Sequence, residues 1–365
     1  MLTTLSSPET LVSPSSLKAS LEAGLFSDGQ PARVHTLKNS QGMTASFMDI
    51  GATWVSCQVP TSKGQREVLL GMKNLEDYQS HSAFLGATIG RFANRIGKGQ
   101  FSLNDQDYQI TINNNDNSLH GGVEGFDKRR WLVKEHSDSH ITYNLTSPDG
   151  DQGFPGSLTV EVAYTLTENN QICIEYSALC DQDCPINLTN HAYFNLDGAE
   201  SGKTILDHDL MLLANEYLPT DQQQIPTGEL RPVDGTSFDF KTARPIRERL
   251  LEDDDQKMAK GYDHAFTLPS ELTDGISPIA QLTSSDKLVS MSVFTDKPAI
   301  QFYSGNFLAG TPSRDGEYQD YQGIALETQF LPDCPNHPEW PAENKRFIAK
   351  KTFYQYQTSY QFEAH

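Results

Sequence analysis

The chain has 365 residues and a formal net charge of −20, with 48 acidic and 28 basic residues. A nucleic-acid-binding protein normally carries a basic patch or stripe, and the sequence has none. No stretch approaches the ~20 apolar residues of a membrane span, and residues 1–16 lack the basic and apolar segments of a secretory signal. We therefore expect a cytoplasmic protein that binds neither nucleic acid nor membrane, while an uncharged small ligand stays compatible with the acidic charge.

The cysteine content points away from a disulfide framework and from a metal site. The chain has five cysteines, an odd number and a low density for its length. Cys180 and Cys184 have the spacing of half a zinc site, but no second pair lies at zinc spacing. We therefore expect thiols in the core or on the surface and no bound metal.

Residues 1–30 differ in composition from the rest of the chain, because they are rich in Ser, Pro and Thr. Leu17, Leu21 and Leu25 repeat at helical spacing after Ser15 and Ser16, which are candidate caps for a short helix. We expect residues 1–30 to be an N-terminal extension that is partly disordered, ahead of one domain at residues 31–365.

From residue 31 onward, alternation of apolar and polar residues predicts strands. Residues 158–166 and 172–179 alternate on either side of a short polar turn, which predicts a β-hairpin. Helical patterns are confined to residues 75–84 and 245–251. Many short strands without an internal repeat predict an all-β sandwich or barrel. Further strands are expected at 44–48, 55–59, 108–112, 141–145, 288–294 and 300–303.

Several common active-site motifs are absent from the sequence. Gly97 and Gly99 are followed by Ser102 where a dinucleotide-binding fingerprint needs its third glycine. There is no Walker A motif, no H-E-x-x-H zinc motif and no G-x-S-x-G nucleophile elbow. These absences argue against nucleotide, zinc-protease and serine-hydrolase chemistry, and we expect no cofactor.

Polar residues instead gather within apolar, Gly-rich or strand-like runs. Glu327 follows Ile324-Ala325-Leu326, so we expect its carboxylate to be partly buried, with a raised pKa unless partners hydrogen-bond it. Such a group is a candidate general base. Taken singly, a histidine in a strand is more often structural, and Asn-rich segments often serve turns. The other candidates are Asn94, Arg95, His120, His191, Asp263 and Gln301.

Taken together, these clusters resemble the aldose 1-epimerase (galactose mutarotase) family from about residue 31 to the C-terminus. One such motif alone is weak evidence, but several motifs in the same order along the chain are specific evidence. The first ~30 residues depart from the family pattern. The matching stretches are Gly90–Ile96, Asn117–Gly122 with Gly125–Trp131, Asp149–Gly156, Thr189–Leu196, Gly261–His264, Gln301–Asn306, and Leu326–Gln329 with Pro332-Asp333. The resemblance implies a large twisted β-sandwich, the galactose mutarotase-like supersandwich, with a few short helices and an open sugar cleft.

The resemblance further implies an isomerase that interconverts the α and β anomers of free hexoses such as galactose and glucose by ring opening and reclosure. It implies that Glu327 is the catalytic base and His191 the catalytic acid. It also implies that the sugar hydroxyls are bound by Asn94, Arg95, His120, Asp263 and Gln301. We expect acidic neighbours to help hold His191 protonated, because the acid must donate a proton.

Some questions stay open at this point. Phe302 or Tyr303 could lie against the sugar or belong to the core, and Asp263 could instead form a structural ion pair with Arg95. The rival functions are a glycoside hydrolase with Asp263 as its second carboxylate, a non-catalytic sugar-binding protein, and an epimerase of sugar phosphates, whose site should hold more Arg and Lys. The expected partner is a small aldose; a monomer and a weak homodimer both fit the sequence.

Overall fold

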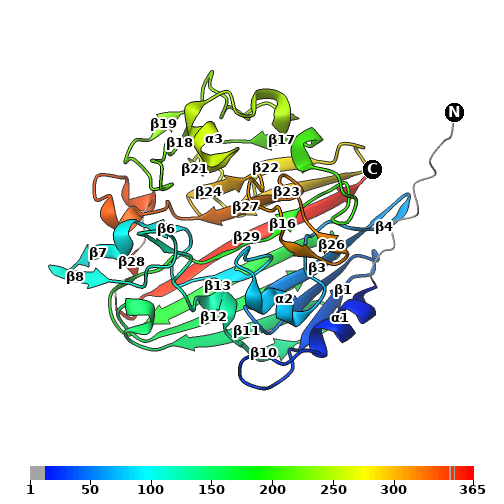
Figure 1. The fold of residues 1–365 in the computed structure, drawn as a ribbon, viewed down its shortest axis with the longest axis horizontal. Coiled ribbons are helices and arrows are strands. Elements are labelled where there is room, and N and C mark those ends of the chain that lie inside the picture. The colour runs from blue at the N-terminus through cyan, green and yellow to red at the C-terminus, as the bar shows by residue number, and fades with distance from the viewer. Residues whose placement is uncertain (1–12, 345–346, 349) are drawn as a thin grey trace.

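The protein is a twisted sandwich of antiparallel β-sheets. The computed structural model describes residues 13–344, 347–348 and 350–365. A nine-stranded sheet forms one layer, and a six-stranded and a four-stranded sheet pack against it (Figure 1). One continuous hydrophobic cluster contains side chains from all three sheets. The expectation of an all-β sandwich with a few short helices is therefore confirmed.

The order of the strands in space differs from their order in the sequence in the two larger sheets. The nine-stranded sheet consists, in spatial order, of β10 Leu132–His136, β11 His140–Ser147, β12 Leu158–Leu166, β13 Gln171–Cys180, β29 Phe353–Ala364, β23 Val289–Thr295, β22 Pro278–Thr283, β17 Asp209–Leu212 and β20 Arg244–Pro245. The six-stranded sheet consists of β16 Tyr193–Phe194, β27 Ile324–Gln329, β24 Ala299–Tyr303, β21 Asp263–Thr267, β18 Glu216–Tyr217 and β19 Arg231–Pro232. The four-stranded sheet consists of β1 Val34–Lys38, β2 Thr44–Met48, β3 Thr53–Thr61 and β4 Gly64–Glu67. The two-stranded pairs are β14 Cys184–Pro185 with β28 Phe347–Ile348, β15 Thr189–Asn190 with β5 Thr88–Ile89, β25 Pro312–Ser313 with β26 Gly316–Glu317, β6 Arg95–Ile96 with β9 Ser118–Leu119, and β7 Gln100–Leu103 with β8 Gln106–Gln109.

Most strands predicted from alternation are present, and the predicted hairpin is formed by β12 and β13, with Leu166 opposite Ile172. The strand expected at 108–112 is displaced, because β8 ends at Gln109. Its position is set by the turn Asn104-Asp105, in which both residues have positive φ (53° and 60°), the conformation of a tight hairpin turn. The pairing of this hairpin therefore starts earlier than the apolar pattern indicates.

The helices are short and lie at the edges of the sandwich. Within the described residues, none is long and apolar enough to cross a bilayer. Residues 245–251, expected to give two helical turns, contain only a 3₁₀ turn. The α-helices are α1 Pro14–Glu22, α2 Leu75–Ser80 and α3 Asp254–Ala259. The 3₁₀ turns are Gly97–Gly99, Phe126–Lys128, Asp151–Gly153, Ile205–Asp207, Ile246–Arg249, Cys334–Asn336 and Ala342–Asn344.

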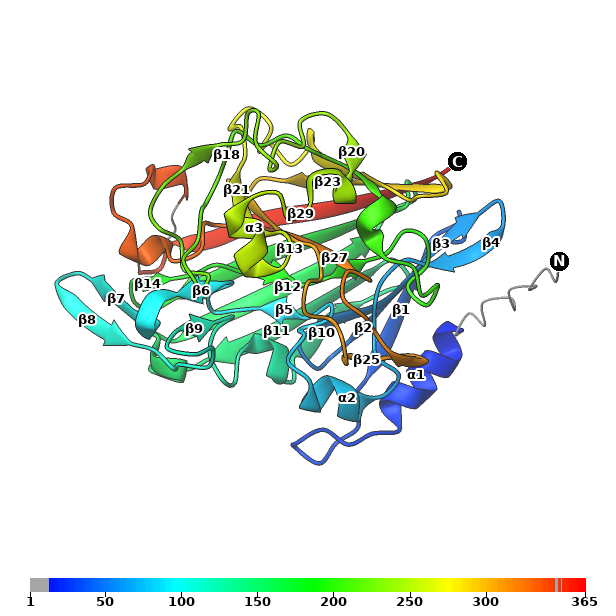
Figure 2. The same cartoon turned by 45° about the horizontal axis from the view of Figure 1, so that its top comes forward.

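The N-terminal helix is part of the packed structure. Ser13, and not Ser15 or Ser16, caps α1: its Oγ accepts a hydrogen bond of 3.2 Å from the Ser16 amide. Leu17 and Leu21 are buried in a small hydrophobic cluster with side chains of β1, β2, β3 and α2. Helix α1 lies beside β1 and α2 (Figure 2). Residues 1–12, where disorder is expected, lie outside the described residues.

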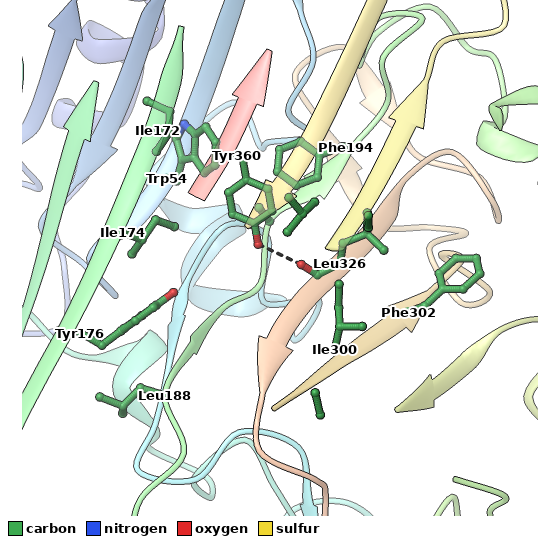
Figure 3. Close-up of a cluster of buried hydrophobic side chains, with 14 of the residues drawn as sticks. Trp54, Ile172, Ile174, Tyr176, Leu188, Phe194, Ile300, Phe302, Leu326 and Tyr360 are labelled. Carbon is green, nitrogen blue, oxygen red and sulfur yellow. Dashed lines mark hydrogen bonds between the residues drawn. The ribbon is translucent and has the colours of Figure 1, made fainter. Parts of the chain in front are cut away.

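The central strand β27 separates the hydrophobic core from a polar face of the same sheet. Ile324 and Leu326 belong to the main hydrophobic cluster, and Figure 3 shows a part of it that includes Leu326. The Tyr360 hydroxyl of β29 donates a hydrogen bond of 2.9 Å to the Leu326 carbonyl, and this bond links the two large sheets (Figure 3). All six residues of β27 are buried, so both of its faces are covered by protein.

We expect Tyr360→Phe to lower the free energy of unfolding by about 1 kcal/mol, because it deletes one buried hydrogen bond between the sheets without leaving a cavity. Tyr143→Phe is the matched control, since the Tyr143 hydroxyl is buried without a partner among the described residues. Its removal should leave stability unchanged or raise it. Urea unfolding of both variants measures the difference; an equal effect of the two substitutions would contradict the stabilising role of the Tyr360 bond.

Candidate active site

One face of the six-stranded sheet carries a row of polar and aromatic side chains. Gln301 lies opposite Glu327 in the β24–β27 pair, and Asp263 lies opposite Tyr303 in the β21–β24 pair. Directly opposed residues share a face, and so do residues two positions apart on a strand. The alternation that sends Ile300, Phe302 and Leu326 into the core therefore places these four side chains together on the other face.

Two residues in left-handed backbone conformations bring the 94–95 and 120 segments to this face. Asn94 has φ 68° and His120 has φ 51°, values that Asn and His tolerate better than most residues. The Asn94 amide donates to Nδ1 of His120 over 3.1 Å, and the His120 amide donates to the Asn94 carbonyl over 3.1 Å. Arg95 then pairs with Leu119 in the short β6–β9 ladder. These bonds fix the two backbone segments and the His120 ring relative to one another.

His191 lies between β15 and β16, where its amide donates to the Ala87 carbonyl over 2.9 Å. Its ring stacks on Tyr193 at a centroid distance of 4.8 Å and meets the edge of His120 at 5.2 Å. Its Nε2 lies 3.5 Å from Oε1 of Glu327. The two candidate proton-transfer groups are therefore neighbours.

These side chains line a cavity of about 250 Å³. A volume just below the usual range of ligand pockets, which begins at about 300 Å³, suits a small polar molecule. The wall combines aromatic rings with amide, imidazole, guanidinium and carboxylate groups, which supply donors and acceptors for hydroxyl groups. The lining residues are His81, Ser82, Ala83, Phe84, Asn94, Arg95, Leu119, His120, His191, Tyr193, Gln224, Asp263, Tyr303, Phe307, Leu308 and Glu327.

Burial dominates the electrostatics of the histidine–glutamate pair. Glu327 is 2% and His191 5% exposed. Desolvation raises the pKa of Glu327 well above its ordinary value, the Asp263 carboxylate adds to this effect, and Lys297 and Arg95 oppose it. Desolvation lowers the pKa of His191 to about 4. The expectation that acidic neighbours hold His191 protonated is therefore wrong for the free protein, in which the pair prefers a neutral histidine and a protonated glutamate.

Part of the pair's hydrogen-bonding capacity is unused. His191 Nδ1 and Glu327 Oε2 are buried and have no hydrogen-bond partner among the described residues, and the same holds for Gln301 Oε1. Buried polar atoms normally find a partner, so the unpaired atoms of His191 and Glu327, which line the cavity, are available to a ligand. This arrangement can transfer protons to and from a bound hydroxyl compound.

The chain matches the family model described as aldose 1-epimerase over residues 33–361. It is 50% identical over 342 residues to the aldose 1-epimerase of Escherichia coli strain K12, which covers 93% of this chain and 98% of that protein. The chain belongs to the aldose 1-epimerase family. It is accordingly an isomerase.

Other members of the aldose 1-epimerase family are similar over most of the fold. The human galactose mutarotase is 39% identical over 294 residues, with 80% of this chain and 83% of that protein covered. The structure of a galactose 1-epimerase from Lactobacillus acidophilus superposes with a TM-score of 0.80 at 28% identity, covering 93% of this chain and 97% of that one. The expected mutarotase-like sandwich is confirmed by this likeness.

The structure brings together the seven residues that the sequence singles out. Six of them line the cavity, and Gln301 stands behind it, where its Nε2 donates to Oδ1 of Asp263 over 2.7 Å. Of the two open aromatic assignments, Phe302 is a core residue and Tyr303 lines the cavity. The open question of a direct Arg95–Asp263 ion pair is also answered, because in the described structure Gln224 stands between the two groups.

Sequence reasoning missed several residues of this site. Phe84, which has φ 56°, places its ring 4.7 Å from that of His120 and 5.9 Å from that of His191. Tyr193 supports His191 by stacking. Tyr193 belongs to one of the matching stretches without standing out in it, and Phe84 lies in an expected helix that ends earlier, at Ser80. Nothing in the local pattern distinguishes such residues from core aromatics.

Lys297 is a further missed residue, a fully buried lysine next to β27. Its Nζ donates to the Leu188 carbonyl over 2.6 Å and to the Thr328 carbonyl over 3.3 Å, and it lies 3.9 Å from the centre of the Tyr176 ring. Burial lowers its pKa to about 7, against the opposing effect of Asp296 and Glu327. When protonated, this lysine favours the ionised form of Glu327.

We expect the stability of the protein to decrease as the pH falls below about 6.5, in part because His264 is buried and neutral. Its Nδ1 accepts a 3.0 Å bond from the Asp263 amide, and burial lowers its pKa from 6.5 to about 3. The unfolded chain therefore binds a proton at His264 at a higher pH than the folded protein does. This difference lowers the free energy of unfolding by about 1.5–2 kcal/mol between pH ~6.5 and ~5.

Urea unfolding at the two pH values, in the wild type and in His264→Phe, measures this contribution. The variant keeps an aromatic ring next to Phe238 but cannot titrate. Its loss of stability between the two pH values should be smaller than that of the wild type by about 1.5–2 kcal/mol. Identical pH dependence of the two proteins would refute the assignment.

Proposed function

We propose that the protein interconverts the α and β anomers of free hexoses, with galactose and glucose as substrates, and that Glu327 and His191 transfer the protons. The observation that supports this most strongly is the 3.5 Å contact between His191 Nε2 and Glu327 Oε1 at the wall of a polar cavity. The names of the relatives, aldose 1-epimerase and galactose mutarotase, point to the same reaction and to galactose.

In the proposed reaction, ionised Glu327 removes the proton from the C1 hydroxyl while protonated His191 donates a proton to the ring oxygen. The bond between C1 and the ring oxygen breaks and gives the open-chain aldehyde. Rotation about the C1–C2 bond presents the other face of the carbonyl to the C5 hydroxyl, and reclosure reverses both transfers. Asn94, Arg95, His120, Asp263 and Gln301 position the sugar, directly or through one another.

The burial of the pair fits this sequence of steps. Ring opening moves one proton to Glu327 and one away from His191, so the enzyme passes from an ion pair to two neutral groups. Two neutral groups are the state that desolvation favours in the free protein. Burial therefore stabilises the enzyme form that accompanies the open-chain intermediate, and the nearby cations Arg95 and Lys297 limit the cost of re-ionising Glu327 for reclosure.

We expect Glu327→Gln and His191→Asn each to lower the turnover number by ~10²–10⁴-fold, because each removes one proton-transfer group and keeps a similar shape. The change of optical rotation of freshly dissolved α-D-galactose and α-D-glucose measures the rate. Circular dichroism establishes that both variants are folded. Turnover that survives in either variant at the wild-type level would refute the assigned role.

The pH dependence of kcat/KM tests whether the pair works with a single shared proton. Below about 4, the lowered pKa of His191, both groups are protonated and no base remains. Above the raised pKa of Glu327, the pair has lost its last proton and no acid remains. We expect a bell-shaped profile with an acid limb near about 4. A rate that rises through the ordinary histidine pKa of ~6.5 would contradict this mechanism.

The rival functions make different predictions in the same assays. A glycoside hydrolase would release free sugar from methyl α- and β-galactosides, and we expect no release. A sugar-binding protein without catalysis would bind galactose without accelerating the change of optical rotation. A sugar-phosphate epimerase would prefer galactose 6-phosphate, although Arg95 is the only Arg or Lys among the described residues that line the cavity.

We further propose a cytoplasmic enzyme that is a monomer or a weak homodimer, with residues 1–30 as an extension of one catalytic domain at residues 31–365. Cys57, Cys173, Cys180 and Cys184 form no disulfide within the described residues, as is usual in a reducing compartment. The start of the family match at residue 33 is compatible with this division. Light scattering at increasing protein concentration measures the oligomeric state.

A further inference from the structure

We propose that Gln224 is a positioning residue that holds Arg95 and Asp263 apart and in register for the hydroxyl groups of the sugar. This inference rests on the proposed sugar site and adds to it a residue that neither the motifs nor the pairing of the strands indicates. Gln224 lies in the connection between β18 and β19, in a loop closed by a bridge between Thr220 and Pro226, and its side chain lines the cavity.

Both polar atoms of the Gln224 side-chain amide form hydrogen bonds. Its Oε1 accepts a hydrogen bond from Nη2 of Arg95, and its Nε2 donates a bond of 3.0 Å to Oδ2 of Asp263. The other oxygen of Asp263 accepts from Gln301. One neutral amide thus stands between a guanidinium and a carboxylate that attract each other, and it forms a hydrogen bond with each of them.

The backbone of Gln224 supports a role for its side chain. Its φ is 61°, a left-handed value that favours glycine and costs a residue with a Cβ some stability. The loop does not need the Gln224 side chain for its own shape. Oδ1 of Asp221 accepts from the amides of Gln223 and Ile225 over 2.8 and 3.0 Å, and Asn117 donates to Oε1 of Gln223 over 2.9 Å.

The amide matters because of what the two charged groups would do without it. Arg95 and Asp263 lie in the same cavity wall, and each already affects the pKa of the other. Without a spacer, they can close into a direct ion pair, which uses the donors and acceptors that a hydroxyl compound needs. With the amide in place, Arg95, whose Nε donates to Oδ1 of Asn114 over 3.3 Å, keeps its other N–H groups for the sugar, and Asp263 is held by the amides of Gln224 and Gln301.

The test is a series of three variants. Gln224→Gly removes the amide and also relieves the left-handed strain, so we expect an unchanged or higher melting temperature. The dissociation constant for galactose, measured by calorimetry, should rise about tenfold, while the turnover number changes less than about twofold, because the lost contacts serve ground and transition states alike. The exposed neighbour in the same loop provides the control, Gln222→Ala, which should change neither quantity.

Gln224→Glu keeps the shape and the acceptor for Arg95 but turns a carboxylate toward Oδ2 of Asp263. We expect weak galactose binding at pH ~8 that recovers several-fold toward pH ~5, as one of the two facing carboxylates takes up a proton. The wild type and the Gly variant should show no such recovery. A purely structural role of Gln224 would not produce this pH dependence.

Two results would overturn the inference: unchanged galactose binding in Gln224→Gly, or weaker binding accompanied by a lower melting temperature and an equal loss of turnover number. Calorimetry needs no turnover, so the test separates this inference from the proposed reaction. If the wild type binds galactose without accelerating anomer exchange, the proposed reaction is refuted. The comparison of galactose binding between the wild type and the Gln224 variants then still tests the positioning role of Gln224. If the wild type binds neither galactose nor glucose, both are refuted.

Discussion

The burial of a carboxyl group against an imidazole is the constraint on which the site depends. Glu327 and His191 are almost fully buried, and their side chains lie 3.5 Å apart. Ionising either group alone therefore costs much free energy, unless the other group carries the opposite charge. The pair therefore behaves as one unit with one proton to place. An exposed pair would ionise independently, with ordinary pKa values, and would lose the coupling by which, in the proposed reaction, a single ring-opening step neutralises both groups.

The sandwich provides this burial through one strand with two different faces. On one side, β27 joins the core through Ile324 and Leu326 and is tied to β29 by the Tyr360 hydroxyl. On the other side, it carries Glu327 to the cavity. Because side chains alternate strictly, a slip of one residue in the β24–β27 register would exchange the two sets. The apolar residues that fix the register therefore also fix the position of the Glu327 carboxylate.

Much of this arrangement could be predicted from the sequence. The alternation at 158–166 and 172–179 gives the central hairpin, and the placement of Glu327 after three apolar residues indicates a buried carboxylate. The grouping of seven distant residues came from the family resemblance, because strand periodicity says nothing about which strands become neighbours. Alternation at 108–112 was misleading, since the Asn104-Asp105 turn determines the pairing of that hairpin.

Other features could not be read from local patterns because tertiary burial creates them. The neutral state of His191 follows from its desolvation, which outweighs the acidic composition of the whole chain. Gln224 lies in a polar loop segment, Asp221–Gln224, that is indistinguishable by composition from any surface turn. Lys297 precedes a proline at the start of β24, a place where an exposed lysine is the ordinary expectation.

The central claim is that the free protein holds the proton of the pair on Glu327, and nitrogen NMR of His191 tests it most directly. The ¹⁵N shifts of the imidazole, assigned by comparison with His191→Asn, report its protonation state near pH ~7. We expect a neutral imidazole in the wild type, and the same in Glu327→Gln. An imidazolium at neutral pH in the free wild-type protein would contradict this claim, because it would mean that Coulombic pairing outweighs desolvation in this site.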